Sequence, residues 1–221
     1  MLVGFVFELA VIPPLAERKN DVVHWHPEHI SERYGLFTII VLGESILSAV
    51  LALEAADAAG GFKNLLLIAG GGLLCAVSFW WLYFGRPNRH APSATAAVFL
   101  WGYTHLLVWA AIAGFGAGLA VLAEASSGHA ESQIAIATAT FTCAAVLASL
   151  ALVNLFGDAD GRSQFARAML LGAVAVVVIG LVVSVAWTAL AIALVTGGLV
   201  AWLVTRVERP GVSAYLPRPS R

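Results

Sequence analysis

Long apolar runs alternate with short polar stretches along the 221 residues of this chain. Several runs reach the roughly 20 residues that an α-helix needs to cross the hydrocarbon core of a bilayer. The pattern predicts one helix for each run. The ranges are 1–15, 30–54, 62–85, 94–122, 132–156, 165–183 and 187–206, the last two being divided near Ser184-Val185-Ala186-Trp187. The expected fold class is all-α, a polytopic helical membrane protein with about seven (six to seven) transmembrane helices.

Basic residues mark one side of this topology. Every Lys and Arg residue except Lys63 falls on the same side of the predicted spans. These residues are Arg18, Lys19, Arg33, Arg86, Arg89, Arg162, Arg167, Arg206, Arg209, Arg218 and Arg221. Because basic residues accumulate on the cytoplasmic side, these loops and the C-terminus are expected to be cytoplasmic. Residues 1–209 then form a single transmembrane domain, and residues 210–221 form a disordered cytoplasmic tail.

The composition agrees with a membrane location and argues against several classes of function. Hydrophobic residues make up 60% of the chain and charged residues 11%, which is far from the balance of a soluble domain. A net charge of −1, with no dense basic cluster, gives no reason to expect a nucleic acid as partner. Cys75 and Cys143 lie singly inside apolar runs, so we interpret both as core residues. The lipid bilayer is the expected partner, and no cofactor is expected.

Small and aromatic residues occupy defined places within the predicted helices. Glycines occur at 70–72, at 114, 116 and 118, and at 197–198, where we expect close contacts between helices. Trp80, Trp81 and Tyr83 fall near the cytoplasmic end of their predicted helix, where aromatic belts form.

Glu44 is the most informative polar residue in the apolar pattern. It lies in Gly35-Leu36-Phe37-Thr38-Ile39-Ile40-Val41-Leu42-Gly43-Glu44-Ser45-Ile46-Leu47, near the centre of a run long enough to cross a bilayer. A charged side chain there costs a few kcal/mol or more unless it faces other protein, so by default it marks a functional site. Ser45 follows it directly, and Ser48 follows one helical turn later.

Two further ionisable groups are expected near the same depth. At 1.5 Å per residue, Glu44 lies about 16 Å beyond Arg33, and His105 lies about 14 Å inside the edge of its own helix. Glu8 also falls roughly half-way across the membrane. Matching depths predict a shared site for an ion or small solute. Its expected members are Glu44, His105, Glu8, Ser48 and Ser45. The alternative is a satisfied hydrogen-bond network that fixes the register of the helices.

A second polar cluster lies at the predicted cytoplasmic edge, in His24-Trp25-His26-Pro27-Glu28-His29-Ile30-Ser31-Glu32-Arg33. Imidazole and carboxylate groups suit zinc or nickel, which makes His24, His26 and His29 candidate metal ligands. Pro27 is expected to open the helix, however, so His24 and His26 are not presented on its rigid face. The competing interpretation is a polar interface between loops, with acids favoured at a helix N-terminus. Its members are His26, His29, Glu32 and Arg33.

Several motifs follow one another over the first half of the chain. The longest runs from His29 to Ile46, and Trp80-Trp81-Leu82-Tyr83-Phe84 and Tyr103-Thr104-His105 come after it. Phe7-Glu8-Leu9, with Pro13-Pro14, comes before it. In this order they resemble the motifs of the bacterial low temperature requirement protein A family, over roughly Phe7 to Leu122.

The resemblance implies a multi-span protein of the bacterial inner membrane that is associated with growth in the cold. Family members are usually much longer, and this chain is similar to their C-terminal half. We therefore expect a homo-oligomer, or a partner that supplies the N-terminal half. Faces left open for it are expected at Glu8 and at the glycine series 114–118. An acidic residue usually follows the Trp-Trp motif, but Gly85 stands there, which weakens any acid-dependent role of that helix.

Three functions are compatible with this sequence. The leading hypothesis is a transporter or channel component that moves a proton, a cation or a small solute through Glu44, His105 and Glu8. The second is an intramembrane enzyme that acts on a lipid-linked substrate with a Glu/His acid–base pair. The third is a non-catalytic membrane scaffold or sensor. Because no nucleophile or metal motif is recognisable, the sequence favours a protein that is not an enzyme.

Overall fold

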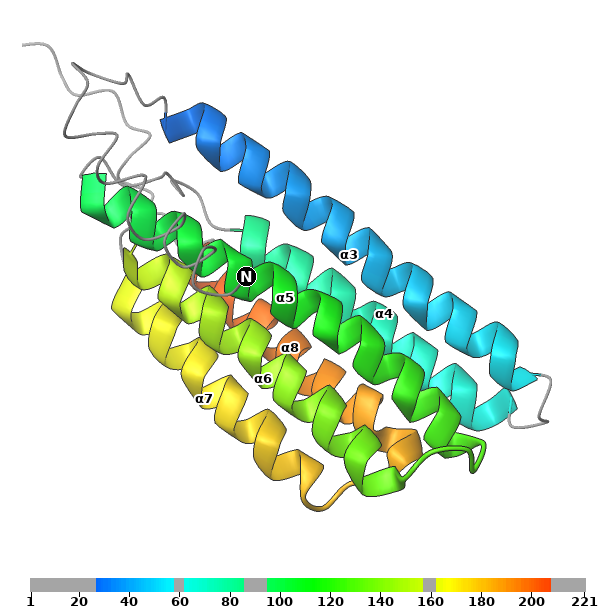
Figure 1. Cartoon of the computed structure of the whole chain (residues 1–221). Coiled ribbons are helices and arrows are strands. Elements are labelled where there is room, and N and C mark those ends of the chain that lie inside the picture. The colour runs from blue at the N-terminus through cyan, green and yellow to red at the C-terminus, as the bar shows by residue number, and fades with distance from the viewer. Residues whose placement is uncertain (1–26, 58–61, 86–94, 157–161, 208–221) are drawn as a thin grey trace, which may run out of the picture.

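Six α-helices make up nearly all of the described structure. The computed structural model describes residues 27–57, 62–85, 95–156 and 162–207, and within these ranges it contains no strand. The helices are α3 (Pro27–Asp57), α4 (Phe62–Phe84), α5 (Thr95–Ser126), α6 (Ser132–Phe156), α7 (Arg162–Gly180) and α8 (Val185–Val207) (Figure 1). The predicted helix at 1–15 and the predicted tail at 210–221 lie outside the described residues.

The predicted all-α membrane architecture is confirmed in its main features. By length and composition, α4 to α8 are each apolar enough to cross a membrane. The sixth helix, α3, is 31 residues long and carries Glu44. The last apolar stretch is indeed divided, although the break lies at residues 181–184, slightly before the predicted division. The full number of spans, with the helix at 1–15, stays a prediction.

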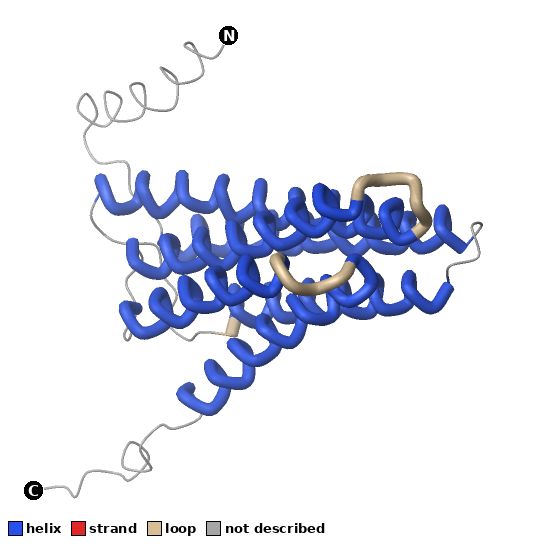
Figure 2. Tube along the Cα trace, turned by 90° about the horizontal axis from the view of Figure 1, so that it is seen from below, coloured by secondary structure: helices blue, strands red, loops and turns tan. Residues whose placement is uncertain are grey.

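The helices form a closed arrangement in which each has two main neighbours. α3 packs on α5 and α4, α5 packs on α6, and α6 packs on α7. α8 packs on α4 and α7 and so completes the arrangement. Figure 1 shows α3 at one edge of the bundle and α7 at the opposite edge, and Figure 2 shows most of the helix axes roughly aligned with one another. Since α3 stands at an edge, one of its faces has no described helix against it.

Hydrophobicity does not distinguish the inside of this bundle from its outside. Leu82, Val108 and Leu147 are fully buried, while Leu171 and Leu194 are each 71% exposed. Lipid tails are as apolar as these side chains, so burying them gives little driving force for association in a membrane. Close packing and interhelical hydrogen bonds must therefore hold the helices together.

Glycines provide the closest of these contacts. A Cβ atom on Gly71 of α4 would lie 2.5 Å from the carbonyl carbon of Ala189 on α8, so the two backbones touch. A Cβ atom on Gly116 of α5 would lie 3.0 Å from the Cα atom of Ser45 on α3. The prediction of close packing is confirmed at these helices.

Other glycines do not follow the predictions. The expectation that the series 114–118 forms an open face is wrong, because Gly114 and Gly118 pack against α6 and Gly116 packs against α3. Conversely, Gly70, Gly197 and Gly198 have no atom within 4 Å of an added Cβ, so they do not mediate contacts among the described residues.

Charged residues separate to the two ends of the bundle. α3 begins and α8 ends at the same end, as Figure 1 shows. Among the described residues, the basic residues at this end are Arg33, Arg162, Arg167 and Arg206. The opposite end carries Lys63 with Glu54, Asp57, Glu124 and Glu131. The described part of the chain thus has the one-sided distribution of basic residues that the loops predict.

The Gly71 contact makes a stability prediction. We expect Gly71→Ala to lower the free energy of unfolding by about 1–3 kcal/mol, because the added methyl group would overlap the backbone of α8. The melting temperature in mild detergent should fall by several degrees. Gly70→Ala is the matched control, since its methyl group enters open space and alanine favours the helix. Equal melting temperatures for the two variants would contradict the close contact.

The distribution of charge makes a topology prediction. A reporter that is active only in the periplasm should be inactive when fused after Val207 and active when fused after Ala125, because basic ends stay in the cytoplasm. Activity of the first fusion together with inactivity of the second would reverse the orientation. The abundance of both fusions, measured by immunoblot, is the control.

Candidate functional site

His105 lies at the centre of an aromatic cluster between α3, α4 and α5. Its side chain is completely buried. The imidazole centroid lies 4.2 Å from the ring of Trp101, 4.8 Å from Tyr34, and 5.9 Å from both Tyr83 and Trp109. Three helices therefore contribute rings to the surroundings of one titratable group. We call these four rings the His105 cage.

The hydrogen bonding of His105 identifies its tautomer. The Nδ1 atom lies 2.8 Å from the carbonyl oxygen of Trp101. A carbonyl oxygen only accepts, so Nδ1 carries a proton and donates it. In the neutral ring Nε2 is then the acceptor, and it is the atom at which a second proton is gained or lost.

Two hydrogen bonds join α3 to α5, one through the Thr38 hydroxyl and one through the Ser45 hydroxyl. Trp109 Nε1 donates to Thr38 Oγ1 at 2.9 Å, and the Thr38 hydroxyl donates to the carbonyl oxygen of Tyr34 at 2.8 Å. Further along the helix, Ser45 Oγ lies 3.0 Å from the carbonyl oxygen of Ile112 and 3.1 Å from that of Val41. The expected ion-binding hydroxyl of Ser45 is thus buried and engaged with backbone carbonyls.

Glu44 lies on the other side of α3. Its side chain is exposed, and no described residue forms a hydrogen bond or ion pair with its carboxylate. Ser48 Oγ donates to the backbone carbonyl oxygen of Glu44 at 3.0 Å and not to the carboxylate. The described helices therefore leave the charge of Glu44 uncompensated.

The structure does not bring Glu44 and His105 together. α3 and α5 run in the same direction, with Tyr34 beside His105 and Ser45 beside Ile112. Glu44 is ten residues beyond Tyr34, which is about 15 Å along the helix axis. The expectation of equal depth is wrong, because it counted from Arg33 whereas α3 already begins at Pro27.

The polar cluster at the start of α3 is only partly described. His29 Nδ1 lies 3.8 Å from Glu32 Oε2, with both side chains well exposed, and Arg33 is also exposed. Glu28 lies in the first turn of the helix, where an acidic residue is favoured. His24, His26 and Glu8 lie outside the described residues, and within the described ranges no three metal-binding side chains gather. The metal hypothesis for His24, His26 and His29 thus stays a prediction.

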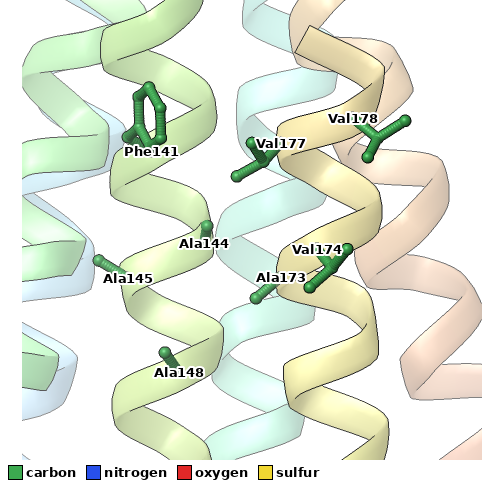
Figure 3. Close-up of a pocket in the computed structure, with 8 residues that line it drawn as sticks. All are labelled: Phe141, Ala144, Ala145, Ala148, Ala173, Val174, Val177 and Val178. Carbon is green, nitrogen blue, oxygen red and sulfur yellow. The ribbon is translucent and has the colours of Figure 1, made fainter. Parts of the chain in front are cut away.

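A groove on the surface between α6 and α7 has a volume of about 440 Å³ (Figure 3). Its walls consist of alanine, valine and one phenylalanine side chain. They are Phe141, Ala144, Ala145, Ala148, Ala173, Val174, Val177 and Val178. Such a surface offers no oxygen or nitrogen side-chain atom to an ion, so it fits hydrocarbon and not a charged solute.

Sequence reasoning singled out His105 but missed its surroundings. Tyr34 belongs to the first motif of the sequence, Tyr83 to the second and His105 to the third, and the fold brings all three together. Tyr83 is 5% exposed, so it is a cage residue and not part of an aromatic belt, whereas Trp80 is 43% exposed. The spacing of Tyr34, Thr38 and Ser45 places them on one helix face and was a usable signal.

The convergence of separate motifs agrees with a comparison against protein families. The family described as bacterial low temperature requirement A protein (LtrA) matches residues 1–205. The chain belongs to this family. The LtrA match continues well beyond Leu122, where the recognisable motifs end. Comparison with curated proteins and with solved structures finds no match.

The bond between Trp109 and Thr38 can be measured in a double-mutant cycle. Trp109→Phe removes the donor but keeps an aromatic ring against Tyr34, and Thr38→Val removes the acceptor. We expect a coupling free energy of about 0.6 kcal/mol, and at most ~1.7, as for other interhelical hydrogen bonds in membranes. The free energy of unfolding is measured by denaturant titration in mixed micelles.

The matched control for this cycle is Thr188→Val on α8. The Thr188 hydroxyl also donates to the carbonyl oxygen four residues before it, at 3.0 Å, but it does not bond to Trp109. Its effect should add to that of Trp109→Phe without coupling. Equal coupling for Thr38 and Thr188 would contradict the proposed tie between α3 and α5.

Proposed function

We propose that this LtrA protein is a transporter or channel component of the bacterial inner membrane that moves a proton, a cation or a small solute. The observation that carries the proposal is the place of Glu44. It stands 17 residues after the start of α3 and 13 before its end, on a face that no described helix covers. Carboxylates are rare in such places, where a charge costs about 2.5–3.5 kcal/mol on insertion scales. The Glu44 carboxylate raises the free energy of membrane insertion and makes no described contact between helices. A role in binding an ion or a proton accounts for its presence.

His105 supports the proposal as a second titratable group in the same pair of helices. Direct proton exchange with Glu44 is not possible over about 15 Å. The Thr38 hydroxyl lies on α3 between the two levels and the Ser45 hydroxyl lies next to the level of Glu44, both at the α3–α5 interface. We assign to His105 the binding of a proton at the α3–α5 interface, and to Glu44 the binding of the ion near mid-membrane on the outer face of α3.

The alternatives fit the geometry less well. An intramembrane enzyme that used Glu44 and His105 as an acid–base pair needs both groups within hydrogen-bond reach of one substrate, and they stand at different levels. A scaffold accounts for the buried His105, whose cage would fix helix register. It does not account for Glu44, which contributes no described contact between helices.

Replacing Glu44 tests this function. Glu44→Gln keeps the shape of the side chain and removes its charge and its titratable proton, so we expect loss of transport with normal folding. The assays are dye-reported proton flux into proteoliposomes under an imposed potential and restoration of growth to a cold-sensitive deletion strain. Glu54→Gln is the matched control, because Glu54 is also exposed on α3 but lies near its end. His105→Gln should give a partial loss, since an amide hydrogen-bonds but does not shuttle protons.

Full growth and flux with Glu44→Gln at normal protein abundance would exclude the ion-handling role. Equal loss with Glu44→Gln and Glu54→Gln would point to a general effect of surface charge instead. Protein level in the membrane and melting temperature are measured in parallel, so that a folding defect is recognised as such.

A further inference from the structure

An exposed arginine lies on the same side of α7 as the wall of the apolar groove. Val174 and Val178 line the groove. Arg167 comes seven residues before the first and eleven before the second, and both spacings return to one side of a helix. The side chain of Arg167 is exposed, as is that of Leu171 between it and the groove. One side of α7 therefore leads from a guanidinium group at the basic end of the bundle into the groove.

The position of Arg167 along α7 puts its charge close to the phosphate groups of one leaflet. α7 has 19 residues, so it is about 28 Å long and close to the ~30 Å thickness of the hydrocarbon core. The backbone of Arg167 lies about 8 Å beyond Arg162, where the helix begins. From such a place a long arginine side chain extends its charged group to the headgroup region. The leaflet concerned is the one at the basic end, which we expect to be cytoplasmic.

The groove has the direction and depth of an acyl chain of that leaflet. Val178 lies about 16 Å beyond Arg167 along the helix axis, which is about half of the ~30 Å hydrocarbon core. Ala148 lies at the end of the groove nearer to the basic end of the bundle, and Phe141 lies at the other end (Figure 3). The alanine side chains make the surface hollow between α6 and α7, whereas the Phe141 ring is large and 61% exposed. A chain that enters beside Arg167 thus meets small side chains first and a bulky ring near mid-membrane.

We propose that Arg167 and the groove between α6 and α7 form one binding site for a phospholipid of this leaflet. The guanidinium group donates hydrogen bonds to the phosphate diester, for which its planar fork is suited, and one acyl chain lies in the groove. Since lipid tails are as apolar as the groove, contact with hydrocarbon alone selects no particular lipid. The phosphate contact supplies the affinity, and the hollow surface fixes the place of the chain. This site goes beyond the transport proposal and does not depend on it.

Lipid binding by the full chain in mild detergent tests the site. The probes are dipalmitoyl phosphatidylglycerol and dipalmitoylglycerol, which has the same two chains and no phosphate. Native mass spectrometry of a lipid titration gives the apparent Kd of the one-to-one complex. Arg167→Gln should weaken the phospholipid complex about tenfold, as expected for hydrogen bonds to a charged group, and leave the complex with dipalmitoylglycerol unchanged. Ala145→Phe fills the groove and should weaken both complexes several-fold.

Matched variants separate this site from general effects of charge and size. Arg206→Gln removes a basic side chain at the same end of the bundle, but Arg206 lies over the ring of Trp202 on α8, at 5.9 Å. Ala201→Phe places the same ring on an exposed position of α8. Neither control should change the Kd of either lipid. Ala148→Leu is a smaller filling of the groove, for use if Ala145→Phe lowers the melting temperature.

Three results would overturn the proposal. Equal weakening by Arg167→Gln and Arg206→Gln would mean that the phosphate is attracted by the basic end as a whole. Unchanged binding by both Ala145→Phe and Ala148→Leu, in folded protein, would place the acyl chain elsewhere. A protein dimer that dissociates when Ala145→Phe is introduced, with lipid binding unaffected, would assign the groove to a second copy of the chain.

Discussion

Polar groups inside the hydrocarbon layer must find their partners within the protein, and this constraint determines how the bundle is held together. Most of its serine and threonine hydroxyls donate to a carbonyl oxygen three or four residues earlier in the same helix, as Ser78 and Thr104 do. Such a bond gives the hydroxyl group a partner but does not connect one helix to another. Among the described residues, two of the bonds that cross between helices, at Thr38 and Ser45, join α3 to α5. The place of α3, and with it the places of Tyr34 and Glu44, depends on these contacts.

The helices themselves could be predicted from the sequence because a bilayer requires about 20 apolar residues for each crossing, whatever their neighbours. From residue 30 onward each predicted range has a helix in the structure, even where two runs were continuous. The rotation of each helix was not predictable in the same way. On α3, Leu42 faces the bundle and Ile40 faces outward, and both are equally apolar. Hydropathy therefore contains no signal that places Glu44 outside.

For the candidate site, too, the sequence identifies a residue but not its neighbours. His105 is visible as a polar residue in an apolar run, but the rings around it come from three helices and look like ordinary membrane aromatics. Tyr83, two residues after Trp81, points into the cage, while Trp81 is 38% exposed. Depth was predicted from the count of residues, which failed for Glu44 and His105 because the starting point of α3 was misplaced. Only contacts such as that between Tyr34 and His105 fix the level of one helix against another.

The contact between Gly71 and Ala189 has a consequence for the making of this protein. The two residues that touch are 118 positions apart in the chain, and α8 is the last described helix to be synthesised. At ~5–20 residues per second, a ribosome needs about 6–24 s to add the intervening chain. During that time the face of α4 that carries Gly71 borders lipid or the insertion machinery, because α8 has not yet been made. The newly made bundle thus passes through a stage in which the surface around Gly71 is not yet covered by α8. A chain shortened before α8 would keep this surface uncovered.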